Sequence, residues 1–235
     1  MNNNNIVETE LCVEDIIIPV KIRRNSRALR AILRVDPKTR GAIVTLPKYA
    51  SNNDAFELVH RSSDWIMERL AKIPAQIKLG DGVKISLLGQ DYIIYHDLAS
   101  KVTAKKMGHE IIIGGRKEHL ERRTRDWLKK QAKVEILPRA MAMAKIIDCK
   151  IGRLSIRDTK SRWGSCTSGG NMTFCWRLIM SPDWVLDYVV AHEVSHLLHM
   201  NHSTSFWKTV DRFNVKVKEA KKWLSNNGAE LHRYE

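Results

Sequence analysis

The segment that decides the fold is SPDWVLDYVVAHEVSHLLHMNH, which covers residues 181–202. The stretch from Trp184 to Ala191 is apolar on nearly every side, so we expect a helix that lies inside a domain and not on its surface. Ser181 is predicted to cap this helix, and Pro182 suits its first turn because a proline there gives up no helical hydrogen bond. The rest of the domain should pack around this helix.

The buried helix carries the sequence His192-Glu193-Val194-Ser195-His196. Residues four positions apart emerge about 40° apart on a helix, so the two histidines share a face and can bind one metal ion. Glu193 points to a neighbouring side, from which it can reach a water on that metal without becoming a ligand. The motif therefore predicts two metal ligands and a general base.

A catalytic zinc site needs a third protein ligand and an open position for water, and His202 is the candidate. A straight helix would turn His202 about 120° away from His196 and move it roughly 9 Å along the axis, so the chain must bend back. Met200 and Asn201 are predicted to provide the bend, since asparagine tolerates the left-handed conformation that ends helices. The resulting hypothesis is a zinc-dependent hydrolase, with Zn2+ as its cofactor. His199 is interpreted as a solvated or capping residue.

Outside this segment the chain indicates an α+β protein with a change of character near residue 116. Residues 1–115 are predicted to be mainly β, with one helix after Ser51, and residues 116–235 to form a helical domain. A helix is expected from Glu118 to Asp148, kinked or divided at Pro138. Residues 171–180 alternate by period two, which predicts a strand that can align an extended peptide by edge pairing. The other expected strands are 16–20, 31–35, 42–46, 84–88, 92–95, 110–113 and 154–158.

The bulk composition limits the class of protein. The 235 residues are 43% hydrophobic and carry a formal net charge of +14, enough for a real core and a field that attracts polyanions. The four cysteines are far apart and contain no CxxC pair, which favours a reducing compartment. The first residues, MNNNNIVETE, lack the features of a signal peptide, and no segment approaches the ~20 apolar residues that cross a bilayer. A cytoplasmic protein without a membrane partner is expected.

The sequence resembles the YgjP-like metallopeptidase family, which is related to WLM and SprT-type zinc proteases. The resemblance is specific over residues 150–225 and weaker in the N-terminal half. It implies a zincin-like core, in which the H-E-x-x-H helix lies beside a small sheet, and a peptide or protein substrate. It also assigns His192, His196 and His202 to the metal and Glu193 to the base, while Ser195 stands where alanine is usual. The motifs that carry it are Lys160-Ser-Arg-Trp-Gly-Ser-Cys166, Gly170-Asn171, Trp176-Arg177-Leu178, Pro182, Leu186-Asp-Tyr-Val-Val190, His192 to Leu197 and Asn201-His-Ser-x-x-Phe-Trp207.

The residues that contact the substrate are open at this point. Arg162, Asn171 and Arg177 are candidates for stabilising the oxyanion, and each has a structural alternative as a turn, cap or solvated residue. If Lys160 and Arg162 face the metal, they can hold phosphate oxygens, which defines an alternative function as a nucleotide (phosphoanhydride) hydrolase.

A third alternative is a nucleic-acid-associated protein, recruited by the basic surface. It would use Arg23, Arg24, Arg27, Arg30 and the basic helix that follows Arg116. Trp127 is the one aromatic residue clearly inside that helix, and it is interpreted as a core residue.

Overall fold

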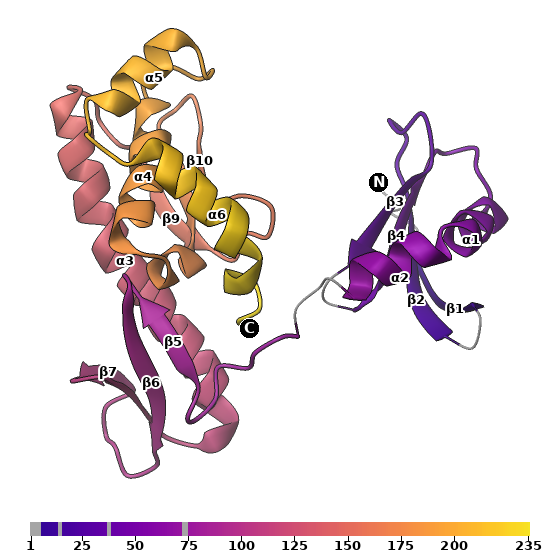
Figure 1. Cartoon of the computed structure of the whole chain (residues 1–235), viewed down its shortest axis with the longest axis horizontal. Coiled ribbons are helices and arrows are strands. Elements are labelled where there is room, and N and C mark those ends of the chain that lie inside the picture. Colours follow the sequence, from indigo (N-terminus) through magenta and orange to yellow (C-terminus); the bar gives the residue numbers. More distant parts are fainter. Residues whose placement is uncertain (1–5, 14–15, 37–38, 72–74) are drawn as a thin grey trace. The chain divides into compact units, whose positions relative to one another are not determined.

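The computed structural model describes residues 6–13, 16–36, 39–71 and 75–235. They belong to two compact units, Met1–Ala75 and Gln76–Glu235 (Figure 1). Each unit combines small sheets with helices, so the predicted α+β class is confirmed. In the described residues, no helix has the length and apolar character needed to span a membrane.

The first unit is a four-stranded sheet covered by two helices. The sheet order is β1-β2-β4-β3, in which β2 and β4 are parallel and the two outer pairs are antiparallel. The apolar residues of β2 and β4 and those of the helices form one core, which includes Ile22, Val44, Val59 and Ile66. The single helix expected after Ser51 is two helices, because α1 ends at Arg61 with Ser62 as its C-cap and a new helix begins at Ser63. The elements are β1 Ile6–Val13, β2 Ile16–Arg24, β3 Ile32–Asp36, β4 Gly41–Leu46, α1 Asn52–Arg61 and α2 Ser63–Ala71.

The second unit begins with a sheet of the same topology. Its order is β5-β6-β8-β7, again with a parallel central pair and antiparallel outer pairs. The elements are β5 Lys84–Leu87, β6 Gln90–Asp97, β7 Ala104–Met107 and β8 Glu110–Gly114. A short 3-10 helix, η1 Lys117–His119, then leads into the long helix α3, Leu120–Ile146. Pro138 lies inside α3 without dividing it.

A three-stranded sheet follows α3, in the order β10-β11-β9. Its strands are β9 Leu154–Arg157, β10 Gly164–Cys166 and β11 Met172–Cys175. The strand predicted over residues 171–180 is therefore shorter than expected. The chain continues as a 3-10 helix, η2 Trp176–Met180, in which all five residues are buried. Alternating apolar residues are also compatible with a fully buried 3-10 helix, so this alternation did not identify a strand beyond Cys175.

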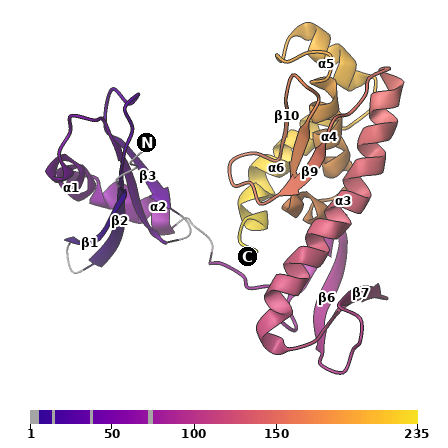
Figure 2. The same cartoon turned by 180° about the vertical axis from the view of Figure 1, so that it is seen from behind.

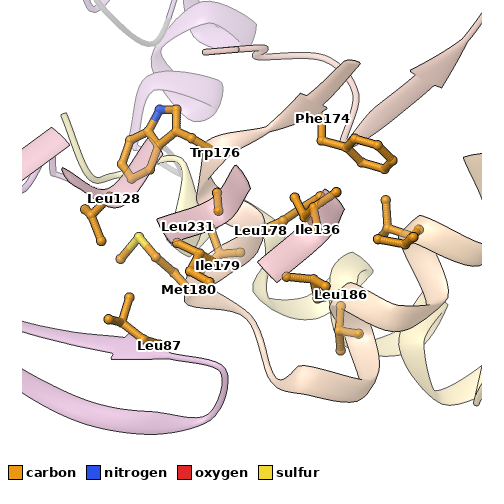
Figure 3. Close-up of a cluster of buried hydrophobic side chains, with 14 of the residues drawn as sticks. Leu87, Leu128, Ile136, Phe174, Trp176, Leu178, Ile179, Met180, Leu186 and Leu231 are labelled. Atoms are coloured by element: carbon orange, nitrogen blue, oxygen red, sulfur yellow. The ribbon is translucent and has the colours of Figure 1, made fainter. Parts of the chain in front are cut away.

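Three helices complete the second unit, namely α4 Asp183–Ser195, α5 Thr204–Asp211 and α6 Val217–Leu231. Helix α4 contacts α3, β10, α5 and α6, while α3 also reaches β7 and β8 (Figure 2). One core joins α3, α4 and α6 with sheet β5–β8 and the small sheet, and it includes Leu87, Leu128, Trp176 and Leu186 (Figure 3). Sheet β5–β8 thus packs with the helical part, and the two compact units meet at residues 75/76.

Candidate active site

Helix α4 is held in the centre of the second unit by apolar residues on all of its sides. Val185, Leu186, Val190 and Val194 are each fully buried. The predicted capping role of Ser181 is wrong, because the helix has Pro182 at its N-cap position and the Ser181 hydroxyl instead donates to the carbonyl of Leu178 at 2.7 Å. Burial, and not a side-chain cap, therefore stabilises this helix and fixes the direction of the residues at its C-terminal end.

The helix ends where the sequence requires the chain to bend. Ser195 is the last helical residue and His196 is the C-cap, after which the amides of Leu198 and His199 donate to the carbonyl of Ser195. Asn201 does not adopt the left-handed conformation that we expected, since it is absent from the positive-φ residues in the described part of the chain. Its side-chain oxygen instead accepts from the amide of Ser203, 3.4 Å away. Ser203 then caps α5.

This bend brings three imidazoles together. The Nε2 atoms of His192 and His202 are 3.0 Å apart, and one ring nitrogen from each of His192, His196 and His202 lies within 4.8 Å of the others. The ring centroids are 4.9 to 5.0 Å apart. Three imidazole nitrogens gathered in this way form a donor set that suits zinc. The residues present therefore fit a catalytic metal ion.

The surroundings of His192 and His196 favour the neutral form of these two imidazoles, which is the form that binds metals. Burial, together with the nearby charges of His196, His202 and Lys221, lowers the pKa of His192 to about 4. Burial also lowers the pKa of His196, although a hydrogen bond to the backbone of His199 opposes this effect. That bond joins Nδ1 of His196 to the carbonyl of His199 at 2.9 Å, so Nδ1 donates and Nε2 keeps its lone pair.

Two aromatic residues of α5, for which no role was predicted, lie against the three histidines. Phe206 is fully buried, and its ring centroid lies 4.7 to 4.9 Å from those of all three imidazoles. Trp207 lies 6.1 Å from His202, nearly parallel to it. The sequence contains a signal for this contact. Ser203 caps a helix that starts directly after His202, and the first turns of this helix place both aromatic rings beside His202.

Glu193 lies next to the histidines with its carboxylate removed from water. The residue is 5% exposed, and its Oε2 atom has no hydrogen-bond partner in the described part of the chain. Burial raises the pKa of this carboxyl to about 7, and the charge of Arg162 opposes the increase. A carboxylate with a pKa near neutrality is suited to accept and return a proton.

Of the four predicted substrate-binding residues, only Arg162 lines the pocket beside Glu193. Lys160 is exposed elsewhere, and the side-chain oxygen of Asn171 accepts from the amide of Arg153 at 2.8 Å. Arg177 is buried, forms an ion pair with Asp158 and donates to the carbonyl of Tyr234. Asn171 and Arg177 thus have the structural roles that were their alternatives.

The small sheet offers a different edge from the one predicted. Strand β11 is central, with β9 parallel on one side and β10 antiparallel on the other, so it has no edge for a peptide. The free edge beside α4 belongs to β10. The amide of Cys175 donates to the carbonyl of Trp163, and the amide of Thr167 donates to that of Asn171. In an antiparallel pair, residues whose backbone groups bond to the partner strand alternate with residues whose groups point away from it. Since Trp163 and Thr167 bond to the partner strand, the backbone groups of Gly164 and Cys166 point away from β11.

A three-histidine donor set at the end of a buried helix, with a buried carboxylate between two of its members, is the arrangement of a metal-dependent hydrolase. Residues 29–227 match the YgjP-like family, in its metallopeptidase domain, and the chain belongs to this family. The predicted resemblance is thereby confirmed. Family membership makes the chain a hydrolase of the metallopeptidase type and implies a metal ion and a peptide or protein substrate.

Among solved structures, the chain is similar to the crystal structure of the metallopeptidase zymogen of Pyrococcus abyssi abylysin. The two are 20% identical, and the match covers 42% of this chain and 97% of that chain with a TM-score of 0.36. No curated protein matches the chain.

Proposed function

We propose that the chain is a zinc-dependent metallopeptidase in which His192, His196 and His202 hold the ion. The observation that carries this proposal is the convergence of three imidazole nitrogens within 4.8 Å at the end of the helix that also bears Glu193. A zinc ion held by these residues would lower the pKa of a bound water and polarise a substrate carbonyl. A donor set of three imidazole nitrogens favours zinc over the cations that prefer oxygen ligands.

Glu193 is proposed as the general base. It removes a proton from the attacking water and returns it to the leaving amine, which a carboxylate can do when its pKa lies near the working pH. Its pKa of about 7 and its partnerless Oε2 atom support this role. Burial in an apolar surrounding also keeps bulk water from competing for the proton.

Strand β10 is proposed to align the substrate. A peptide that pairs with the outward groups of Gly164 and Cys166 would extend past Glu193, because Gly164 lies against that side chain. Such pairing binds the backbone of the peptide through main-chain hydrogen bonds, while pockets along the edge select its side chains. This assignment replaces the edge predicted on residues 171–180.

The test compares the zinc-loaded protein with its Glu193→Gln variant on unstructured protein substrates such as casein. Cleavage by the parent and its loss in the variant, with equal zinc content, is the expected result. Cleavage that survives in the variant, or in protein freed of metal by a chelator, would overturn the assignment. Because all four cysteines are free, the assay belongs under the reducing conditions of the cytoplasm, the compartment we propose.

A second candidate function, hydrolysis of a nucleotide phosphoanhydride, is favoured by one observation. Arg162 lines the pocket that contains Glu193 and His192, so a guanidinium is available to a phosphate group there. Release of phosphate or pyrophosphate from nucleoside triphosphates, without cleavage of protein, would select this function. The nucleic-acid alternative gains no such support, since Trp127 of the basic helix is buried in the core.

A further inference from the structure

A pocket of about 260 Å³ opens beside the proposed base and is built from three parts of the chain. Helix α4 supplies its floor, the segment that enters β10 supplies one wall, and α6 supplies another. This volume is smaller than a typical small-molecule site and suits one side chain or one compact group of a substrate. Its lining residues are Arg162, Trp163, Gly164, Tyr188, Val189, His192, Glu193, Lys221 and Leu224.

The apolar wall of this pocket is fixed in place. The indole of Trp163 stacks on the imidazole of His232, with 4.9 Å between the ring centroids and 29° between the planes. Helix α6 approaches the same indole at Gly228, where a Cβ atom would lie 3.1 Å from Trp163 Cζ2. Trp163 therefore has a defined position, and the pocket keeps its shape without a substrate.

Two cations from different elements line the pocket. The Lys221 ammonium lies 4.0 Å from the centre of the Trp207 ring, and this ring packs beside His202. A cation held over an indole is restricted in position but keeps hydrogen-bond donors for another partner. Lys221 is thus positioned at the histidine side of the pocket.

The guanidinium of Arg162 supplies the second charge. In the described part of the chain it makes no hydrogen bond or ion pair, although its charge acts on Glu193. Glu193 is the one acidic residue among the lining residues. In the proposed reaction its carboxylate contacts the attacking water. Two cations therefore face a pocket whose remaining lining residues cannot neutralise them.

We infer that this pocket is an anion-binding subsite, in which Lys221 and Arg162 hold a carboxylate or phosphate group of the substrate while Trp163 and Leu224 pack against its apolar part. The inference rests on the proposed function and adds a substrate class to it. In a peptide, the group is an acidic side chain adjacent to the bond that is cleaved. In a nucleotide, it is a phosphate.

The experiment measures kcat and KM of the zinc-loaded full chain on matched peptides that carry Glu, Gln or Lys at each position beside the scissile bond, and on nucleoside triphosphates. Lys221→Met keeps an unbranched apolar chain over Trp207 and removes the charge. We expect it to raise KM for the Glu peptide about 10-fold with little change in kcat, the size expected for one charged hydrogen bond. Lys221→Glu should reverse the preference in favour of the Lys peptide.

The matched control is Lys222→Met. Lys222 is the exposed neighbour on α6 and does not line the pocket, so its loss should leave the Glu preference intact. Arg162→Gln should act in the same direction as Lys221→Met. Binding of the Glu peptide can also be measured without turnover in the Glu193→Gln protein. Adding Lys221→Met or Arg162→Gln to that protein should lower its affinity for the Glu peptide in parallel with the rise in KM.

The outcomes separate the inference from the proposed function. Peptide cleavage with equal KM for Glu and Gln, unchanged in both variants, overturns the subsite and leaves the peptidase standing. Hydrolysis of nucleotides alone, with a KM that rises in both variants, supports the subsite with phosphate as its ligand and overturns the peptidase.

Discussion

A Cβ atom at position 164 would lie 2.5 Å from Cγ of Glu193 and 2.6 Å from its Oε1 atom. The backbone of β10 therefore presses directly on the proposed base, and only glycine leaves room for the carboxylate where it now lies. A glycine inside a strand often marks the close approach of another group. Here that group is the side chain whose position decides the proton transfer.

Gly164→Ala should therefore displace Glu193 and impair catalysis more than metal binding. A displacement on the order of 1 Å can cost about 100-fold in rate, so we expect kcat/KM to fall 10- to 100-fold at unchanged zinc content. Overpacking should also lower the free energy of unfolding by about 1–3 kcal/mol. Steady-state kinetics, metal analysis and denaturant titration measure these effects.

The control for this substitution is Gly169→Ala in the following hairpin, where the nearest atom, Nδ2 of Asn171, would lie 3.9 Å from the new methyl group. Its activity should match that of the parent. Equal activity of Gly164→Ala and the parent would show that the contact with Glu193 does not hold the base.

The three-histidine site predicts a sharp difference between His202 and His199. His202→Ala removes one donor of the set and should reduce the bound zinc far below one ion per chain after dialysis. His199→Ala should retain the zinc, because His199 contacts His196 through its backbone carbonyl, which alanine also has. Metal analysis of both variants decides the point, and full zinc content in His202→Ala would remove this residue from the ligand set.

Glu193→Gln should make the metal-free protein more stable at alkaline pH. The pKa of Glu193 rises from 4.5 to about 7 on folding, so the folded state holds the proton more tightly. Relative to the variant, the parent therefore has its highest free energy of unfolding below pH 4.5. This relative stability falls as the pH rises towards 7 and does not change further above that pH. The difference in unfolding free energy should reach roughly 2–3 kcal/mol at pH 8.

Urea titrations of the chelator-treated proteins between pH 4 and pH 9 measure this difference. A constant difference across that range would show that Glu193 is already ionised at pH 5 and that burial does not raise its pKa.

The core of the site could be predicted from short-range pattern, because the histidines and Glu193 lie within eleven residues of one another in sequence. Helical spacing brings His192 and His196 together, and the need for a third ligand identifies the bend before His202. The cause of the bend was not predictable in the same way. Asn201 had the appropriate propensity, but the turn forms through backbone hydrogen bonds to Ser195.

The features that depend on distant parts of the chain could not be derived from pattern. Which strand of the small sheet has a free edge is set by its order, and an alternating sequence is compatible with both a central strand and an edge. Lys221 contributes to the pocket only because α6 packs on α4. The segment after Cys175 shows the same limit, since burial on all sides replaced the expected strand by η2.

Asp158→Asn should destabilise the protein because it removes the negative charge that pairs with the buried Arg177. The Arg177 side chain is 4% exposed, and its remaining bonds go to the carbonyl of Tyr234. A buried charge that loses its partner is costly, but the carboxylate of Asp158 is partly solvated, so we expect a loss of about 1–3 kcal/mol at pH 7. Asp126→Asn, in an exposed pair with Arg122, should cost less than about 0.5 kcal/mol.

The same pair predicts the sign of a pH effect. Burial tends to raise the pKa of Asp158, but the hydrogen bond and charge of Arg177 outweigh it and hold the pKa below 3.8. The stabilisation is therefore present above pH 3.8 and is lost as the pH falls through the folded-state pKa. The gap between the parent and Asp158→Asn should close in acid, and a gap that widened there would contradict this assignment.

We propose that residues 76–235 are the catalytic domain, and truncation tests this boundary against the one expected near residue 116. A fragment that begins at residue 76 keeps the whole of the larger core, and it keeps Ile77, which pairs with Tyr234. It should therefore fold cooperatively and bind zinc. A fragment that begins at residue 116 loses sheet β5–β8, which uncovers apolar residues of α3 and η2 that now share its core.

Such exposure of a large apolar surface favours aggregation, so the shorter fragment should be insoluble or lack a cooperative transition, while the longer one should bind one zinc ion per chain. Calorimetry and metal analysis of the two fragments measure this contrast. The first unit has a separate core and should contribute little to either result. A soluble, zinc-binding fragment of residues 116–235 would instead mean that sheet β5–β8 is an accessory to the active-site helix, and the boundary would return to residue 116.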